Sequence, residues 1–148
     1  MKKQFFLLSL LFVCGLLFAQ DPITWENSVK KTGTNRYEIH IKAIAKPSWH
    51  IFSQTSPEDG GSPTKIFFSK NPMVSFEGKT EEIGKIVRRY EKAFDVTVIF
   101  FESKVEFVQT VVLKEKVKTN LEGSIEFMAC NDHQCLPTRT LKFSVRLE

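Results

Sequence analysis

The sequence predicts an all-β domain built as an antiparallel β-sandwich. Hydrophobic and polar residues alternate with a period of two along several segments, and Gly, Pro, Asn and Asp residues interrupt the chain at short intervals. Alternation places apolar side chains on one face of a strand, and the interruptions end each strand in a turn. We expect roughly seven to nine short strands, which in a chain of 148 residues fits one sandwich.

The first 19 residues have the layout of a secretory signal peptide, followed by a domain over residues 20–148. Lys2 and Lys3 form a basic start, residues 5–18 are almost all apolar, and Ala19 is a small residue at the expected cleavage site. The apolar run is short for a membrane span, so we expect an exported chain without stable membrane insertion. Cys14 follows Val13 within this run, which leaves a lipid anchor as a poorly supported alternative.

The net charge and the number of cysteines both change when the predicted signal peptide is removed. Removal of Lys2 and Lys3 leaves 19 basic and 17 acidic side chains, and no basic block alternates with aromatic residues. Nucleic acid is therefore not an expected partner. Cys14 leaves with the signal peptide, so an even pair of cysteines remains in a compartment where disulfides persist.

The individual strands follow from the alternation in chain order. Residues 36–45 and 141–147 alternate strictly, and residues 124–129 do so more briefly. Residues 96–101 and 105–113 are rich in β-branched and aromatic side chains and predict more deeply buried strands. Residues 64–68 and 74–76 predict shorter strands, with a loop at 56–63 and turns at 70–72 and 102–104. Residues 81–92 have apolar positions at helical spacing, but Gly84 and the β-branched content favour strand or irregular structure.

Cys130 and Cys135 lie in the loop between the last two predicted strands. If those strands pair, the ends of the loop are close and the two cysteines can form a disulfide. Such a small ring would stabilise the fold by only about 2 kcal/mol, which favours a pair that opens and closes over a purely structural bond. A plain surface disulfide remains an alternative. Zinc is another, with Cys130, His133 and Cys135 as ligands and a fourth from His40 or His50.

The cysteine loop lacks an obvious stabiliser of a thiolate. An all-β fold supplies no helix N-terminus to lower the pKa of a cysteine. His133 is the nearest candidate for that task, and Asp132 opposes it electrostatically. We therefore expect an exchanger that reacts mainly with a matched partner.

The segment 123–137, which contains both cysteines and ends in Leu136-Pro137, resembles the active-site signature of the N-terminal periplasmic domain of DsbD, a thiol:disulfide interchange protein. This family is also described as the disulfide bond corrector domain. Residues 46–54, with Trp49-His50, are similar to a second family segment, and residues 63–66 and 90–94 follow in the family's order. The resemblance spans nearly the whole chain after the signal peptide.

The resemblance implies an immunoglobulin-like β-sandwich in the periplasm that works without a cofactor or metal. It implies that Cys135 forms the mixed disulfide with partners and that Cys130 resolves it. Phe94 matches a phenylalanine that caps the sulfurs, and Trp49 and Phe52 match aromatic positions near them. The implied partners are thioredoxin-like periplasmic proteins and a separate DsbD-type membrane electron donor, because the membrane and thioredoxin-like domains of full DsbD are not in this chain. We expect a monomer.

Two departures from the family pattern bear on the chemistry. Four residues separate the cysteines here, whereas the best-known members have five. Lys92 and Ala93 stand where those members have acidic residues in the cap segment, and Glu91 is only a weak substitute. The sequence thus supports two functions: a thiol–disulfide oxidoreductase component, and a non-catalytic immunoglobulin-like binding module with a structural disulfide.

Overall fold

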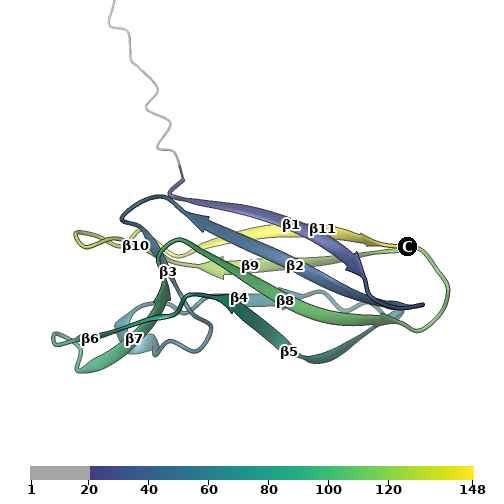
Figure 1. The fold of residues 1–148 in the computed structure, drawn as a ribbon, viewed down its shortest axis with the longest axis horizontal. Helices are drawn as coiled ribbons and strands as arrows, with labels where there is room; N and C mark the ends of the chain where they lie inside the picture. Colours follow the sequence, from purple (N-terminus) through teal and green to yellow (C-terminus); the bar gives the residue numbers. More distant parts are fainter. Residues whose placement is uncertain (1–20) are drawn as a thin grey trace, which may run out of the picture.

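The computed structural model describes residues 21–148 and consists almost entirely of β-strands (Figure 1). The predicted signal peptide, Cys14 and the cleavage site lie outside the described residues. Within residues 21–148 the structure has eleven strands and one short 3-10 turn: β1 Ile23–Lys31, β2 Arg36–Ala45, β3 His50–Phe52, η1 Glu58–Gly60, β4 Lys65–Phe68, β5 Val74–Gly84, β6 Val87–Glu91, β7 Val96–Phe101, β8 Lys104–Leu113, β9 Thr119–Phe127, β10 Ala129–Cys130 and β11 Arg139–Leu147.

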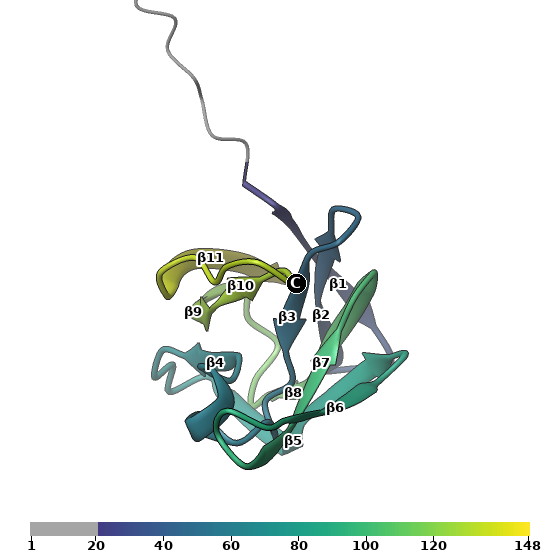
Figure 2. The same cartoon turned by 90° about the vertical axis from the view of Figure 1, so that its left-hand side faces the viewer.

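The strands form three antiparallel sheets with the orders β1-β2-β8-β5, β10-β3-β7-β6 and β11-β9-β4. Long strands such as β1, β2, β8, β9 and β11 run along the length of the molecule (Figure 1). The short strands β3, β6, β7 and β10 gather at one end, which faces the viewer in Figure 2. The predicted antiparallel β-sandwich is confirmed.

The main core lies between the first sheet and the β11-β9-β4 sheet. On β2, the buried residues Tyr37, Ile39, Ile41 and Ala43 alternate with more exposed neighbours, as the sequence predicts. On β11, Phe143, Val145 and Leu147 are buried in the same manner. A period of two thus translates directly into one buried face, because successive side chains of a strand point to opposite sides.

The predicted number of strands is wrong, because β1, β3 and β10 have no local signal. β1 pairs with β2 along its whole length, but it is an edge strand with mostly solvent-accessible side chains and little alternation. β3 has three residues, all buried, and β10 has two. Strands this short exist only because neighbouring strands supply their hydrogen-bond partners. The pairing of β3 with β7 and β10 is long-range and leaves no pattern in the sequence.

The ambiguous segment 81–92 is strand, as predicted. It contains the end of β5 and all of β6. Ile83, Ile86 and Tyr90, which fall at helical spacing, are exposed to solvent instead of forming a buried stripe. Their spacing therefore does not indicate a helix.

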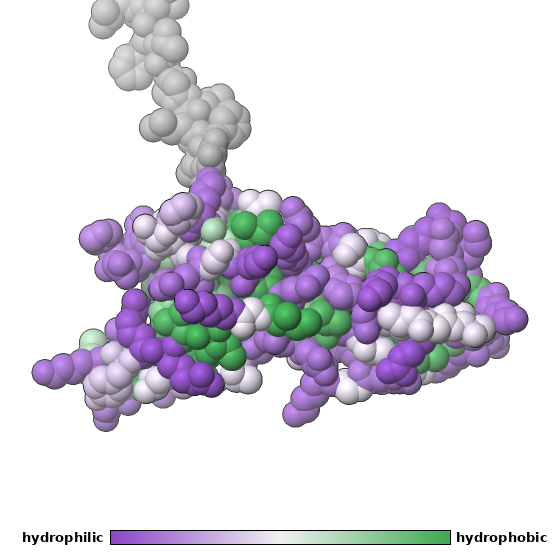
Figure 3. Space-filling view, viewed as in Figure 1, coloured by the Kyte–Doolittle hydropathy of each residue, from purple (hydrophilic) through white to green (hydrophobic). Residues whose placement is uncertain are grey.

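The face of the molecule seen in Figure 3 is mostly polar and has several apolar patches. The large apolar side chains exposed on it are Phe67, Phe76, Ile83, Ile86, Tyr90 and Phe94. Between residues 21 and 148, none of the structure is a helix of the length and apolar character that crossing a bilayer requires.

Candidate functional site

The sheet β10-β3-β7-β6 carries a different core on each of its two faces. Ile51, Phe101 and Ala129 point into the main core. Their strand neighbours point to the other side and form a second, smaller cluster, which we call the outer layer: Phe52, Val98, Phe100 and Cys130, flanked by Val87, Val96 and Met128. This separation follows from the alternation of side chains along each strand.

The two cysteines close a tight hairpin loop that leaves β10. A disulfide joins Cys130 and Cys135, with their Cα atoms 4.0 Å apart. β9 and β11 pair antiparallel, as predicted, and bring both ends of the loop together. The Asn131 side chain shapes the turn, since its Oδ1 accepts hydrogen bonds from the backbone N–H groups of His133 and Gln134, each at 2.9 Å. Asn commonly plays this role in turns.

Replacement of Asn131 by Ala should loosen this loop. The two backbone N–H groups would lose their shared acceptor, and we expect a loss of about 1 kcal/mol of unfolding free energy. Amide hydrogen exchange of His133 and Gln134 should accelerate, while that of the β2–β8 amides stays unchanged. Thr138→Ala, close to the same loop, is a matched control. It removes an exposed hydroxyl contact with Ser62 and should not change the exchange rate of either amide.

The two cysteine residues differ in their exposure to solvent. Cys130 is buried in the outer layer at 2% exposure, whereas Cys135 is exposed. Attack on a disulfide requires an approach to the sulfur that is attacked. Of the two cysteines, Cys135 is therefore the one that an incoming thiolate could approach from solvent.

A cluster of aromatic rings lies beside Cys130. His50 is directly opposite Cys130 in the pairing of β3 with β10. The His50 ring lies 4.3 Å from the Phe100 ring and 5.6 Å from the Phe52 ring, measured between centroids. Phe52 thus lies near the cysteine pair and belongs to its outer layer.

The surroundings of His50 disfavour its protonated form. Burial lowers the pKa of its imidazole below the ordinary value of 6.5, and the positive charge of Arg89 lowers it further. The carboxylates of Asp132, Glu102 and Glu91 oppose this effect. Desolvation dominates, because a charged imidazolium among phenylalanine rings would lose most of its hydration.

Arg89 connects β6 to the cysteine loop, a contact that the sequence does not predict. Its guanidinium lies 5.0 Å from the centroid of the Phe100 ring, a cation–π arrangement. Its Nη1 lies 3.4 Å from Oδ1 of Asp132 and its Nε donates to Glu91 at 2.5 Å. Alternation along β6 places Arg89 on the same face as Val87. The local sequence does not show which residues lie opposite that face.

The remaining predicted site residues lie around this layer at different distances. Trp49 is half-buried and packs against the main core. His133 is exposed in the cysteine loop. Phe94 lies in the turn between β6 and β7 and is 60% exposed. Cys130 pairs with His50, which precedes Ile51, and Ile51 pairs with Phe101 at the end of β7. Phe94 precedes the start of β7. The register therefore places Phe94 and Cys130 at opposite ends of this strand.

The chain segment around η1 covers the outer layer from solvent. Gly61 has a φ of 143°, and a Cβ atom there would lie 2.5 Å from the Phe52 ring. A Cβ atom at Gly60 would lie 2.2 Å from Cγ1 of Val98. The backbone can pack this closely only because both positions are glycine.

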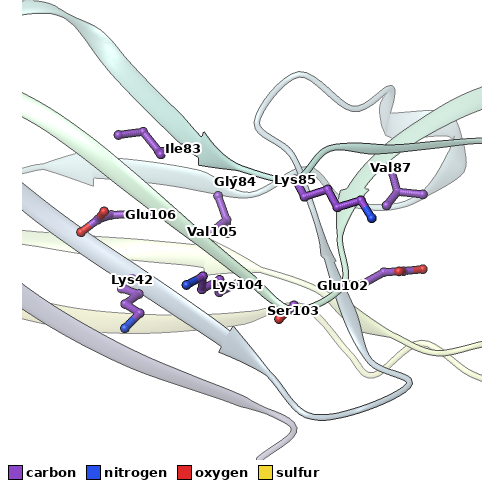
Figure 4. A pocket seen from close by; sticks show the side chains of 10 residues that line it. All are labelled: Lys42, Ile83, Gly84, Lys85, Val87, Glu102, Ser103, Lys104, Val105 and Glu106. Carbon is purple, nitrogen blue, oxygen red and sulfur yellow. The ribbon is translucent and has the colours of Figure 1, made fainter.

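Glu102 lines two cavities. A cavity of about 200 Å³ next to the cysteine loop is lined by Ser48, Trp49, His50, Glu102 and Asp132. A larger one, of about 640 Å³, lies between β8 and the β5–β6 connection (Figure 4). Lys42, Lys85 and Lys104 line the larger cavity together with Glu102 and Glu106, a mixed set that favours no ligand charge, and neither cysteine lines it.

The zinc alternative finds no support in the described residues. Across residues 21–148, no group of three or more His, Cys, Asp or Glu side chains is arranged to hold a metal ion. His40, one proposed fourth ligand, lies on β2 in the first sheet, where its Nδ1 contacts Glu106 at 3.0 Å. His50, the other, lies within the outer layer.

Comparison with known proteins gives matches in structure and none in sequence. No protein-family model matches the chain, and no curated protein matches it. The N-terminal periplasmic domain of ScsB from Proteus mirabilis is similar, with a TM-score of 0.57 and 17% identity over 86% of this chain and 46% of that one. The chain thus spans less than half of that protein.

Two DsbD domains from Neisseria meningitidis are also similar. The N-terminal domain of DsbD in its reduced form has a TM-score of 0.50 and 12% identity over 84% of each chain. The complex between the DsbD N-terminal and PilB N-terminal domains has a TM-score of 0.57 and 8% identity over 88% of this chain and 87% of that one. At these identities the likeness concerns the fold, and the resemblance found in the sequence is confirmed at that level: the chain has the immunoglobulin-like sandwich fold of DsbD N-terminal domains.

Proposed function

We propose that the chain is a periplasmic thiol–disulfide exchange module that passes reducing equivalents through Cys130 and Cys135 to protein partners. The observation that supports this most directly is the unequal exposure of the two bonded cysteines. Cys135 is exposed, and Cys130 is buried opposite His50. A purely structural disulfide in so small a ring would contribute only about 2 kcal/mol to stability.

The proposed exchange proceeds in two balanced steps. In the dithiol form, the Cys135 thiolate attacks a disulfide of the partner, which forms a mixed disulfide and releases one partner thiolate. The Cys130 thiolate then attacks Cys135, the bond to the partner breaks, and the second partner sulfur leaves as a thiolate. The domain is oxidised by two electrons and the partner is reduced. A donor dithiol restores the domain by the reverse path through exposed Cys135.

The proposed partners are thioredoxin-like periplasmic proteins and a DsbD-type membrane electron donor. The structural likeness to periplasmic domains and the predicted signal peptide at residues 1–19 support the location. One similar DsbD domain was solved in complex with the PilB N-terminal domain, which supports docking of a protein at this kind of fold. Phe94, Trp49, Phe52 and His133 are proposed to surround the pair. Phe94 could act as a cap only if its turn moved towards the cysteines.

Equilibration of the domain in glutathione redox buffers tests this function. We expect the Cys130–Cys135 pair to change from disulfide to dithiol within the range of potentials that periplasmic partners span. Free thiols would be alkylated and counted by mass spectrometry. A pair that stays oxidised over the whole range would instead support the alternative, an immunoglobulin-like binding module with a structural disulfide.

A further inference from the structure

The buried imidazole of His50 has a polar atom that lacks a partner in the oxidised domain. His50 is 4% exposed, and its Nε2 atom is buried with no hydrogen-bond partner among residues 21–148. A buried polar atom left unsatisfied costs about 1–3 kcal/mol. Most such atoms in native proteins are satisfied, and the exceptions tend to have a functional reason.

The neighbour of His50 across the sheet changes its hydrogen-bonding capacity with redox state. His50 and Cys130 are directly opposite in the antiparallel pairing of β3 with β10. Side chains at such positions point to the same face, with Cβ atoms about 4.5–5.5 Å apart. In the disulfide, the Cys130 sulfur has no hydrogen to donate. In the dithiol it carries an S–H group, which is a donor.

Burial and the positive charge of Arg89 both disfavour the imidazolium form of His50 and so favour the neutral ring, which has a nitrogen free to accept a proton. The Arg89 guanidinium itself lies over the Phe100 ring. Asp132 in the cysteine loop, Glu102 after β7 and Glu91 on β6 partly offset these effects. A thiolate at Cys130 would add a closer negative charge, which stabilises the imidazolium next to it.

We propose that His50 is the proton acceptor for Cys130 in the reduced domain, its Nε2 accepting a hydrogen bond from the Cys130 thiol. This inference rests on the proposed function and specifies how the resolving step occurs. The Cys130 proton moves to Nε2 of His50, the Cys130 thiolate attacks Cys135, and the partner sulfur leaves with the electron pair of the broken bond. The cavity lined by Ser48, Trp49 and Asp132 then lets the proton pass from His50 to solvent.

The pH dependence of Cys130 alkylation tests this proposal in a domain with a single reactive thiol. In a Cys135→Ser background, His50→Gln should raise the pKa of the Cys130 thiol. A rise of one unit would slow iodoacetamide alkylation near pH 7 about tenfold. His40→Gln is the matched control, because His40 lies on β2 beside Glu38 and Glu106. An unchanged pH profile in His50→Gln would overturn the proposal.

A measurement on the unsubstituted domain covers the case in which His50→Gln does not fold. The ¹⁵N chemical shift of His50 Nε2 should change when the domain is reduced with a phosphine, because Nε2 gains a donor. The His40 shifts should stay constant. A His50 shift that is the same in both redox states would contradict the proposal. A phosphine reduces the disulfide whatever its redox potential, so this measurement does not depend on the outcome of the glutathione experiment. The proposed exchange function and the proposed role of His50 can therefore fail separately.

Discussion

Replacement of Cys130 by Ser should leave the domain trapped in mixed disulfides through Cys135. Exposed Cys135 would still attack a disulfide, but no second thiol would remain to release the product. With oxidised glutathione as the probe, we expect a stable glutathione adduct on Cys135. With a periplasmic thioredoxin-like protein, we expect a covalent complex on a non-reducing gel. Reduction of partner disulfides should fall to background.

The matched variant Cys135→Ser distinguishes the roles of the two cysteines. It retains only the buried Cys130, which should form mixed disulfides at least about tenfold more slowly because a partner cannot approach it. Equal trapping by both variants would contradict the assignment of Cys135 as the attacking sulfur. If mixed disulfides accumulated only in Cys135→Ser, Cys130 would be the attacking sulfur and Cys135 the resolving one.

Replacement of Phe100 by Ala should cost more stability than any other single change near the site. Phe100 is 1% exposed, its ring centroid lies 4.3 Å from that of His50, and the Arg89 guanidinium lies over its ring. Removal of a buried phenyl ring loses its transfer free energy and leaves a cavity, which together amount to about 3–5 kcal/mol. Urea unfolding of the oxidised domain measures this loss.

The same variant should also change the titration of His50. Water entering the space left by the ring would weaken desolvation, so the pKa of His50 should rise towards 6.5. Phe67→Ala is the control, because Phe67 is 52% exposed and its loss should change the unfolding free energy by less than about 0.5 kcal/mol. Comparable destabilisation by both variants would argue against the outer layer as a packed core.

The sequence predicted what depends on local pattern. β2 and β11 alternate strictly, and their buried faces are the predicted ones. The position of the cysteine loop between two paired strands also followed from local signals. In these cases a few consecutive residues determine which face of a strand is buried and which strands, adjacent in sequence, pair with each other.

The surroundings of the cysteines could not be predicted in the same way. His50 meets Cys130 only because three-residue β3 pairs with two-residue β10, and Arg89 reaches Asp132 from a strand 43 residues away. Contacts of this kind arise from tertiary packing and leave no periodicity. The family resemblance pointed to Trp49, Phe52 and Phe94, and it left His50 without a role and Arg89 unmentioned.

The two faces of the β10-β3-β7-β6 sheet have a consequence for how such a domain can change over evolutionary time. Ile51 and Phe101 pack into the main core, whereas their neighbours Phe52 and Phe100 pack in the cluster that contains Cys130 on the reverse side. The partly buried side chains that flank this second cluster do not belong to the main core, so their substitution leaves the packing of the sandwich unchanged. Drift at these flanking positions can adjust the surroundings of Cys130 in small increments, while the scaffold that presents Cys135 keeps its shape.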